Sequence, residues 1–482
     1  MKRSVPLGML LLAVTGIALT ALLPRAEGRS VTGSGAPSGS ASTVGTTLLA
    51  VVVSATRAGG AVRPDSIGLS VETSNLGEPG LALADGIAPL LKALGPSLLR
   101  VGGDSADQPP ATVTPIATLR GLQAVLRASG WSVMITEDLG HYSAAVAQAD
   151  ARRGVAVLGS RLVGIACGNE AGGFVSAGYR ARGWGLTQLI AQDKACLQVV
   201  HAAAPRVPLV GPDSSRATFM SRWTDALSGL ASMATTHFYP MASCPVGWVL
   251  APTLLGPAAQ VIEGSQLAKT VSTARAHGMS FRVDETNSAA CRGIPGLSDS
   301  YASALWGADD VFTVLGLGAQ GLNFHGLVTA AGCRYYSPIC LPAGGRTVRA
   351  QPLYAGLLLA HDVGLGPLLR TSSSSSSLRV HAVARTDGRT GVLLENESGV
   401  RVTVQLAVPG APGLAATTTM SDPRGLTALA GTTLRHGVTE PLHVAGATAT
   451  YRETLAPWTA QVLVTPTPRA TVAGQPSADR AA

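Results

Sequence analysis

The chain has 482 residues, a length that suits one large domain followed by a smaller one. Hydrophobic residues make up 46% of the chain and charged residues 13%, which allows a packed core and excludes an intrinsically disordered protein. The formal net charge of +8 is scattered, without a block of consecutive basic residues. Nucleic-acid binding is therefore not indicated, while mild attraction to an acidic substrate stays open.

The first 28 residues have the pattern of an export signal. Lys2 and Arg3 precede an uncharged apolar stretch from Val5 to Leu23. The stretch is also long enough for an uncleaved membrane anchor, which remains the alternative. Residues 29–45 are rich in Gly, Ser, Thr and Ala and are expected to form a flexible linker. In both cases we expect the body of the protein to lie outside the cytoplasm.

Six cysteines suit an exported protein with disulfide bonds. They are Cys167, Cys196, Cys244, Cys291, Cys333 and Cys340. None forms the CxxC pair of a zinc site. Cys333 and Cys340 are close enough in sequence to staple one loop, but the rest of the pairing cannot be deduced from spacing.

Eight short apolar runs alternate with longer helical stretches. The runs span residues 67–71, 97–101, 131–136, 163–168, 207–211, 233–238, 279–284 and 321–325. They are nearly continuous in apolar residues, as parallel strands buried on both faces must be. Eight such units predict a (β/α)8 barrel over residues 67–370. A doubly wound open sheet is the alternative, because both folds place polar residues after the strand ends.

Shorter alternating segments lie on either side of the barrel pattern. Residues 371–465 contain several, with Asp387-Gly388 as a hairpin turn, and predict an antiparallel β-sandwich. Residues 46–66 begin with a β-branched run that we expect to join this sandwich as an N-terminal strand. Residues 466–482 lack an apolar pattern and are expected to form a disordered tail.

Two glutamates directly follow predicted barrel strands. Glu170 ends the string Cys167-Gly168-Asn169-Glu170 after the fourth strand, and Glu285 follows the seventh. The carboxyl ends of barrel strands meet at one face, so both side chains should line the same bowl. One glutamate alone is most simply a solvated loop residue. A matched pair, however, is what retaining glycoside hydrolysis needs, with an acid/base and a nucleophile about 5–5.5 Å apart.

Neighbouring residues suggest supporting roles. Arg100 lies within the second strand, where it can hold the nucleophile ionised or form a structural ion pair elsewhere in the barrel. His325, in the eighth strand, can shape the sugar site directly or support it through a hydrogen bond. Asn169 is placed to hydrogen-bond a sugar 2-hydroxyl. Strand alternation predicts that Asp284, just before Glu285, points away from the barrel centre.

Several segments together resemble glycoside hydrolase family 79, the family of β-glucuronidases and heparanase-like enzymes. They are RVGGDSADQ (100–108), GNE (168–170), HFYP (237–240), DETNS (284–288), LSDSYASALWGADD (297–310), GLNFHG (321–326) and YYSP (335–338). The resemblance extends from residue 50 to residue 465. GNE is shared widely among retaining glycosidases of the 4/7 superfamily, whereas the strings around Glu285 and His325 are more specific.

This resemblance implies a (β/α)8 barrel with an appended β-sandwich, no metal and no cofactor, and recognition of a β-glucuronic acid unit. It assigns the acid/base to Glu170 and the nucleophile to Glu285. It carries sugar-binding roles to Glu72, Asp104, Asn169, Tyr239 and the adjacent Tyr335 and Tyr336, without deciding which of these two tyrosines matches. The loop with the two adjacent tyrosines would meet the uronic carboxylate. Because that loop contains no lysine, Arg334 or backbone N–H groups would have to supply a positive partner.

The sequence thus predicts a secreted retaining glycoside hydrolase whose partner is a carbohydrate, an exo-acting β-glucuronidase first of all. An endo-acting, heparanase-like glucuronidase and an exo-β-glycosidase for a neutral sugar are the enzyme alternatives. A catalytically silent glycan-binding protein is the alternative from another class. The presence of both Glu170 and Glu285 argues against it, because a binding module has no need of a matched pair.

Overall fold

The computed structural model describes residues 47–77, 81, 85–108, 111–241, 251–326, 333 and 336–467. The predicted leader and linker, Arg334, Tyr335 and the tail beyond residue 467 lie outside the described residues. All described residues belong to one compact unit that starts at Thr46. None of the described helices combines the length and the apolar character needed to cross a membrane.

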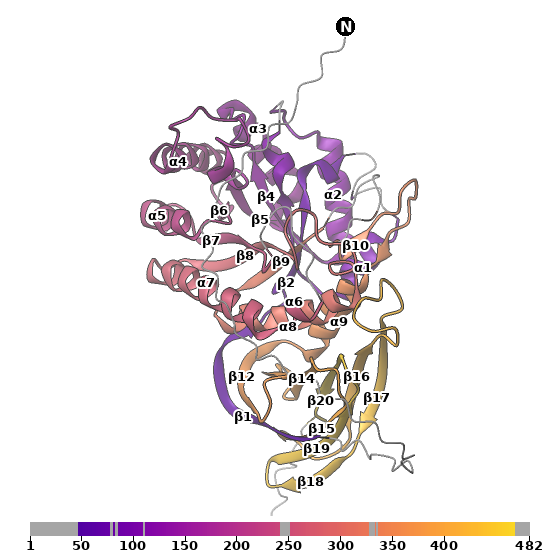
Figure 1. Cartoon of the computed structure of the whole chain (residues 1–482). Helices are drawn as coiled ribbons and strands as arrows, with labels where there is room; N and C mark the ends of the chain where they lie inside the picture. Colours follow the sequence, from indigo (N-terminus) through magenta and orange to yellow (C-terminus); the bar gives the residue numbers. More distant parts are fainter. Residues whose placement is uncertain are drawn as a thin grey trace, which may run out of the picture. The chain divides into compact units, whose positions relative to one another are not determined.

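Eight parallel strands form the barrel (Figure 1). They are β2 (Ile67–Glu72), β3 (Leu98–Gly102), β4 (Ser132–Glu137), β5 (Leu162–Cys167), β6 (Val210–Ser214), β7 (Met233–Phe238), β8 (Ser280–Thr286) and β9 (Gly321–His325). β9 pairs with both β2 and β8, and a parallel bridge between Ile165 and Leu209 joins β5 to β6. The predicted barrel is confirmed. One strand is offset, because β6 continues past the apolar run 207–211 into polar residues.

Helices connect the strands and cover the outside of the sheet. They are α1 (Ile87–Ala93), α2 (Ile116–Ser129), α3 (Ala144–Leu158), α4 (Leu186–Ala203), α5 (Ala217–Leu227), α6 (Ala251–Leu254), α7 (Pro257–Ala276), α8 (Tyr301–Gly316) and α9 (Pro352–Val363). Helix α2 is amphipathic, with one apolar face toward the sheet. The buried residues of this face recur at helical spacing: Leu119, Leu122, Val125 and Leu126. Helix α8 differs: it is buried on nearly all sides and contacts β1 as well as α9.

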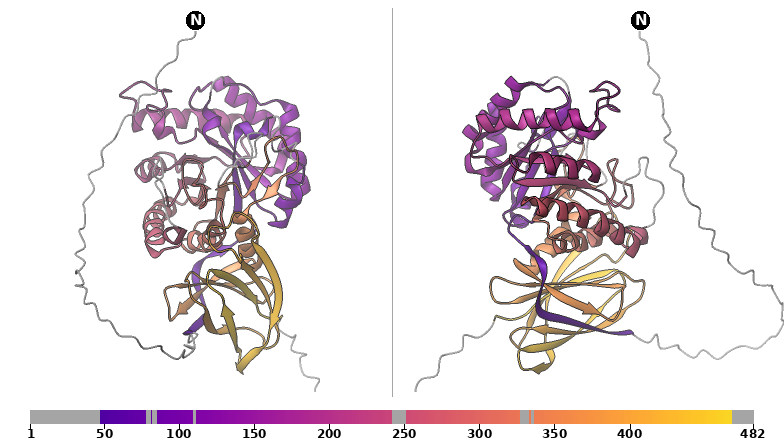
Figure 2. Two further views of the ribbon diagram at one scale, coloured as in Figure 1. Left: turned by 45° about the vertical axis from the view of Figure 1, so that its right-hand side comes forward. Right: turned by 90° about the vertical axis from the view of Figure 1, so that its left-hand side faces the viewer.

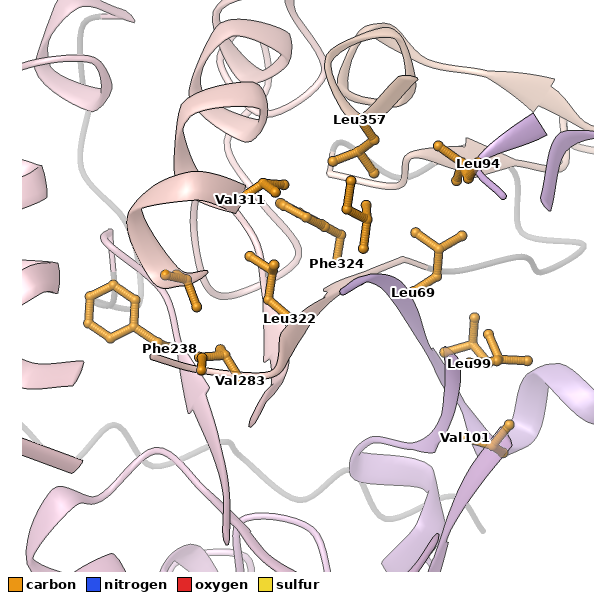
Figure 3. Packing of buried hydrophobic residues seen from close by; sticks show 14 of the residues in the cluster. Leu69, Leu94, Leu99, Val101, Phe238, Val283, Val311, Leu322, Phe324 and Leu357 are labelled. Atoms are coloured by element: carbon orange, nitrogen blue, oxygen red, sulfur yellow. The ribbon is translucent and has the colours of Figure 1, made fainter. Parts of the chain in front are cut away.

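Every second residue of the barrel strands faces outward and packs under these helices. Figure 3 shows Phe324 of β9 near Leu357 of α9, with Leu69, Leu99 and Leu322 of the strands in the same buried cluster. Phe324 and Leu357 have no exposed surface. Burying one such side chain stabilises the fold by about 1.5–3 kcal/mol. This layer fixes the strands and therefore the positions of the groups at their carboxyl ends.

The inside of the barrel changes from apolar to polar along the strands. Leu98, Met134, Ala166 and Val210, one from each of β3 to β6, form a separate apolar cluster. Residues two positions apart in a strand share a face. Arg100, two residues after Leu98, accordingly also points inward, but it is surrounded by polar groups. Within β3, the inward face therefore changes from the apolar Leu98 to the polar surroundings of Arg100.

A second sheet forms the β-domain. It contains β1 (Thr47–Val62), β12 (Gly366–Ser373), β13 (Leu378–Ala384), β14 (Thr390–Asn396), β15 (Val402–Pro409), β16 (Ala415–Ser421), β17 (Thr433–Thr439), β18 (Pro441–Ala445), β19 (Thr448–Leu455) and β20 (Thr459–Val464). β10 (Ile339–Cys340) and β11 (Arg349–Ala350) form a separate short pair. The sheet folds over one core that includes Val51, Val404 and Tyr451.

Strand β1 comes from the N-terminal part of the described chain, yet it lies between β12 and β15 in a sheet of C-terminal strands. It pairs antiparallel with β12 and parallel with β15, and Figure 2 shows it in indigo among the orange and yellow strands. The parallel β1–β15 pair makes the β-domain mostly, rather than wholly, antiparallel. Barrel and β-domain also contact each other through α8. The Tyr301 hydroxyl donates to the carbonyl oxygens of Met420 and Trp458 at 3.0 and 2.9 Å.

Two disulfide bonds are present in the described residues. Cys167, the last residue of β5, is bonded to Cys196 of α4. Cys333 is bonded to Cys340, as the sequence spacing predicts. The first bond lies directly before the Gly168-Asn169-Glu170 string, so it anchors the strand end that carries the predicted acid/base.

Candidate active site

A cavity of about 1000 Å³ opens at the carboxyl ends of the barrel strands. It is lined by Glu72, Ser74, Asp104, Ser105, Gln108, Glu170, Ser215, His237, Phe238, Tyr239, Gln266, Glu285, Ala290, Cys291, Arg292, His325 and Tyr336. Both predicted catalytic glutamates are among these residues. Four carboxylates, two histidines and two tyrosines thus converge in one bowl.

Glu285 lies near the end of β8 and is held at both carboxylate oxygens. Arg100 Nη1 donates to its Oε2 at 2.8 Å, and the Tyr239 hydroxyl donates to its Oε1 at 2.7 Å. The side chain is largely buried, with 11% of its surface exposed. Hydrogen bonds that involve a charged partner are about twice as strong as neutral ones, so the two donors fix the carboxylate firmly.

The pKa of Glu285 is held well below its usual range. Burial acts to raise it, but three nearby cations and one hydroxyl outweigh burial. The cations are His325, His237 and Arg100, and the hydrogen bond comes from Tyr239. The carboxylate therefore stays ionised at neutral pH, which is the state that a nucleophile requires.

Glu170 follows β5 in a left-handed conformation, with a φ of 47°. This conformation costs roughly 1–2 kcal/mol for a residue other than glycine. The Glu170 N–H donates to the carbonyl oxygen of Asp213 at 2.8 Å, which ties the turn to β6. Its carboxyl Oε1 lies 3.1 Å from His237 Nδ1, and 41% of the side chain is exposed. Glu170 thus faces the cavity and can exchange protons with a bound molecule.

His237 lies between the two glutamates. Its Nδ1 is 3.1 Å from Glu170 Oε1 and 3.9 Å from Glu285 Oε2. These distances to a common atom place the two oxygens within about 7 Å of each other, compared with about 5–5.5 Å between carboxyl groups in retaining glycosidases. Burial acts to lower the pKa of His237, but the charges of Glu285 and Asp284 raise it well above its usual value. These charges therefore favour the protonated form of the ring.

Arg100 is the centre of a buried polar layer beneath Glu285. Its Nη2 lies 3.0 Å from Asp213 Oδ2, and its Nε lies 3.7 Å from Asp284 Oδ2. The backbone gives the guanidinium room: a Cβ at Gly102 would lie 2.5 Å from Arg100 Cζ. Arg100 therefore contacts Glu285 together with two further carboxylates, and its role in holding a nucleophile ionised stays a prediction.

The expectation for Asp284 is wrong. Strand alternation predicts that Asp284 points away from the centre, but it is fully buried beside Arg100 and His237. The pairing of β8 shows why, because the register shifts on both sides of the strand at this point. Such a β-bulge adds a residue without reversing the face, so Asp284 and Glu285 both point inward. Burial first, and then the charge of Asp213, raises the pKa of Asp284 to about 7.

The predicted residue Asn169 is buried and is not among the residues that line the cavity. Its Oδ1 accepts from Arg100 Nη2 at 2.8 Å, and its Nδ2 donates to Asp104 Oδ1 at 3.2 Å. Its backbone N–H donates to Asp107 Oδ2 at 2.6 Å. The amide thus links Arg100 to a cavity residue, while a direct contact of Asn169 with sugar stays a prediction.

Glu72 and Asp104 form an acidic part of the cavity wall at the ends of β2 and β3. Glu72 Oε2 accepts from the Ser105 hydroxyl at 2.6 Å, and its Oε1 lies 3.5 Å from His325 Nε2. His325 Nδ1 lies 3.7 Å from Glu285 Oε2. Burial acts to raise the pKa of Glu72, but bonds and charge from His325 and Ser105 lower it. Burial, followed by the charge of Glu72, raises the pKa of Asp104.

Tyr239 and Tyr336 stand side by side, with ring centroids 6.4 Å apart. Tyr239 follows β7, and its hydroxyl is committed to Glu285. Tyr336 follows β9; its ring lies 5.7 Å from that of His325, and its carbonyl oxygen accepts from Asn287. Burial first, and then the charge of Glu285, raises the pKa of Tyr336, so its hydroxyl keeps its proton. Tyr335 lies outside the described residues.

Sequence reasoning missed three members of this site: His237, Asp213 and Asp284. Two of them carry signals that are visible in hindsight. His237 lies two residues before Tyr239, so strand alternation places both on one face. Asp213 follows the fifth apolar run, and the rule of inspecting strand ends applies to it as much as to Glu170. The bulge that turns Asp284 inward leaves no signal in the sequence.

One group of side chains has the spacing of a metal site. Asp213, His237 and Asp284 offer ligand atoms within 4.8 Å of one another. The Arg100 guanidinium already lies among them, 3.0 Å from Asp213 and 3.5 Å from His237. A metal cation would be placed against this fixed positive charge. The donor set therefore fits an arginine rather than a metal ion.

No protein-family profile and no curated protein matches the sequence of the chain. Solved structures do match its fold. A 4-O-α-L-rhamnosyl-β-D-glucuronidase from Fusarium oxysporum 12S, solved with Rha-GlcA, is 18% identical with a TM-score of 0.68, covering 87% of this chain and 100% of its own.

Two arabinofuranosidases are similar to a comparable degree. The GH51 enzyme from Xanthomonas axonopodis pv. citri is 14% identical with a TM-score of 0.65, covering 87% of this chain and 100% of its own. The family 51 enzyme from Bifidobacterium longum is 14% identical with a TM-score of 0.66, covering 86% and 99%. At these identities the likeness concerns the fold. The chain has the barrel and β-domain fold of glycoside hydrolases, among them a glucuronidase.

Proposed function

We propose that the protein is a retaining glycoside hydrolase that removes terminal β-linked glucuronic acid, with Glu285 as the nucleophile and Glu170 as the acid/base. One observation carries this proposal. Both carboxyl groups lie within 4 Å of the same nitrogen of His237, in one cavity, and their environments differ. Glu285 is buried and anionic, whereas Glu170 is partly exposed. Such a pair of unlike carboxyl groups can divide the two roles of the reaction.

In the first step, Glu285 attacks the anomeric carbon and forms a covalent glycosyl ester. Glu170 gives its proton to the leaving oxygen as the glycosidic bond breaks. Attack removes the negative charge of Glu285. Arg100 nevertheless remains paired with Asp213 and Asp284, so no buried cation is left without a partner.

In the second step, water attacks the anomeric carbon and passes a proton to Glu170, and the ester bond to Glu285 breaks. Two inversions at carbon give net retention. Departure of Glu285 as a carboxylate restores its bonds to Arg100 and Tyr239. Since these donors are fixed by burial before the reaction, they need no reorganisation as the charge returns.

Two features support a glucuronide as the substrate. The sequence resembles glycoside hydrolase family 79, and the fold is similar to that of a solved β-D-glucuronidase. The cavity also offers the Tyr336 hydroxyl as a protonated donor in the loop that the resemblance assigns to the uronic carboxylate. On these grounds we place the chain with family 79 as part of the same proposal.

The size of the cavity favours a substrate that extends beyond one sugar. Its volume of about 1000 Å³ lies at the upper end of the range for small-molecule sites, about 300–1,000 Å³. An endo-acting glucuronidase that binds a longer chain is therefore the second candidate. We also propose export from the cytoplasm, because disulfide bonds persist in oxidising compartments and two of them join pairs of described residues.

The test is hydrolysis of p-nitrophenyl β-glucuronide by the purified protein, beside the matching β-glucoside and a longer glucuronic-acid-containing oligosaccharide. We expect release from the glucuronide with retention at the anomeric carbon, followed by proton NMR. A 2-deoxy-2-fluoro glucuronide with a good leaving group should leave an adduct on Glu285 that peptide mass spectrometry detects. Inversion, or an adduct on another residue, would contradict the assignment.

A further inference from the structure

The turn that follows β8 presents an arginine to the cavity. The Gly293 N–H donates to the Ala290 carbonyl oxygen at 3.1 Å, which closes a four-residue turn. Both central residues are left-handed, with φ of 57° at Cys291 and 72° at Arg292. Cys291 and Arg292 both line the cavity. The turn thus places the arginine at the wall of the cavity.

This backbone conformation is unusual for these two residues. Turns with two left-handed central residues are dominated by Gly, Asn and Asp, because a larger side chain raises the conformational energy there. Cys291 is part of a disulfide bond, which restrains the turn. A strained position that is covalently restrained and lines a cavity suggests that the side chain it carries is used.

The guanidinium of Arg292 has no ion-pair partner among the described residues. Arg292 is exposed, and it lines the cavity. The other cations of the wall are engaged: His237 faces Glu170 and Glu285, and His325 faces Glu72 and Glu285. Of the described lining residues, Arg292 alone therefore offers a positive charge to a ligand.

The remaining wall restricts where a negative group of a substrate can lie. Glu72 and Asp104 at the ends of β2 and β3, together with the Glu285 anion, repel a carboxylate. The same acidic groups accept hydrogen bonds from sugar hydroxyls. A uronic acid therefore fits best with its hydroxyls toward Glu72 and Asp104 and its carboxylate toward the turn after β8.

We propose that Arg292 selects a uronic acid over a neutral sugar by donating to the carboxylate of the sugar that Glu285 attacks. This inference rests on the proposed glycosidase function and identifies the positive partner for the carboxylate. The planar guanidinium can donate two parallel hydrogen bonds to one carboxylate. The Tyr336 hydroxyl is the second donor at this position, since it faces the same cavity and lies within reach of the charge of Arg292.

The experiment compares kcat/KM for p-nitrophenyl β-glucuronide and β-glucoside in the unmodified protein, Arg292→Gln and Arg292→Lys. We expect Arg292→Gln to lower kcat/KM for the glucuronide about 10- to 100-fold and to leave the glucoside value within about twofold. Arg292→Lys keeps the charge and should restore part of the preference. Arg57→Gln, at an exposed position of β1, removes the same charge away from the cavity and should change neither substrate.

Binding of free glucuronate and of glucose, followed by calorimetry, makes the inference testable even without turnover. A protein that hydrolyses neither glycoside contradicts the proposed function, but Arg292 is still supported if Arg292→Gln loses glucuronate binding. If Arg292→Gln keeps the unmodified ratio of glucuronide to glucoside, or keeps unmodified glucuronate binding, the assignment of Arg292 is overturned. Absence of glucuronate binding to the unmodified protein overturns it as well.

Discussion

Glu285 in the barrel and Glu395 in the β-domain are both strand glutamates removed from water, yet their environments hold them in opposite charge states. Glu285 receives hydrogen bonds from Arg100 and Tyr239, and its pKa is well below the usual range. Glu395 of β14 has no exposed surface, and within the described residues neither of its oxygens has a hydrogen-bond partner. Burial, followed by the charges of Glu397 and Asp309, raises its pKa well above the usual value.

Burial therefore does not decide the charge of a carboxyl group; the groups that face it do. Both glutamates lose hydration, which favours the neutral acid. In the barrel, the charges of His325, His237 and Arg100 reverse that preference. In the β-domain, Arg379 Nε donates to Glu397 at 2.7 Å instead, and Glu395 stays neutral. The comparison predicts that the same substitution will have different consequences in the two places.

The largest expected effect is on turnover in Glu285→Gln. Glutamine has nearly the same shape but cannot form the glycosyl ester, so kcat should fall by about 10⁴-fold or more. Hydrolysis of p-nitrophenyl β-glucuronide measures the loss, and circular dichroism checks the fold. Glu395→Gln is the matched control, with the same chemical change at a buried glutamate outside the cavity, and it should retain activity within about twofold. Substantial activity in Glu285→Gln would exclude this residue as the nucleophile.

The second effect concerns stability and is expected in Arg100→Met. This change leaves Asp213, Asp284 and Glu285 facing one another in the barrel without their common cation. Breaking a buried ion pair by removing one partner destabilises a protein by about 3–5 kcal/mol. Urea unfolding should show a loss of that size.

Arg389→Met is the control for Arg100→Met. Arg389 pairs with Asp387 at 2.7 Å in a partly exposed position, where such a pair contributes about 0–1 kcal/mol. Equal losses of unfolding free energy in the two variants would mean that Arg100 does not stabilise the buried layer as described.

A smaller effect is expected in Tyr239→Phe. The variant removes one hydrogen bond to the Glu285 carboxylate, and a bond to a charged group contributes about 1.5–3 kcal/mol. Removal of a donor from the anion raises the pKa of Glu285. The acid limb of the kcat/KM profile should therefore move to higher pH, and kcat/KM should fall about 10- to 100-fold. A lower rate with an unmoved acid limb would show that Tyr239 acts on the substrate alone.

Much of the barrel could be predicted from sequence, because its strands are buried on both faces and read as apolar runs. Seven of the predicted runs overlap their observed strands closely, and the glutamates stand where strand ends must converge. The exception is β6, which extends past the apolar run through Pro212, Asp213 and Ser214, and Asp213 contacts Arg100 in the polar interior instead of a helix layer. A pattern of hydrophobicity cannot anticipate a strand that is buried among charges.

The polar layer beneath the glutamates could not be assembled from sequence for a related reason. Arg100, Asp213 and Asp284 come from three strands, and only their meeting in space makes each of them acceptable in the core. The bulge in β8 also changes which side chains face inward. The alternation of inward and outward residues along a strand does not reveal from sequence where one residue is added. Tertiary contacts, rather than local pattern, decide these positions.

The effect that tests the β-domain side of the comparison is the pH dependence of stability in Glu395→Gln. The ordinary pKa of glutamate is 4.5, and the folded-state value of Glu395 is well above it. Above pH 4.5 the unfolded chain therefore loses this proton while the folded protein keeps it. Folding then binds a proton, so Glu395 makes the protein less stable as pH rises, by at most about 1.4 kcal/mol per pH unit.

Glutamine does not titrate, so the Glu395→Gln variant lacks this dependence of stability on pH. The free energy of unfolding of Glu395→Gln minus that of the unmodified protein should increase between pH 5 and pH 8, measured by urea titration at constant ionic strength. A difference that does not change with pH would mean that Glu395 is ionised in the folded protein. A nearby cation would then have to stabilise its carboxylate, as Arg100 does for Glu285.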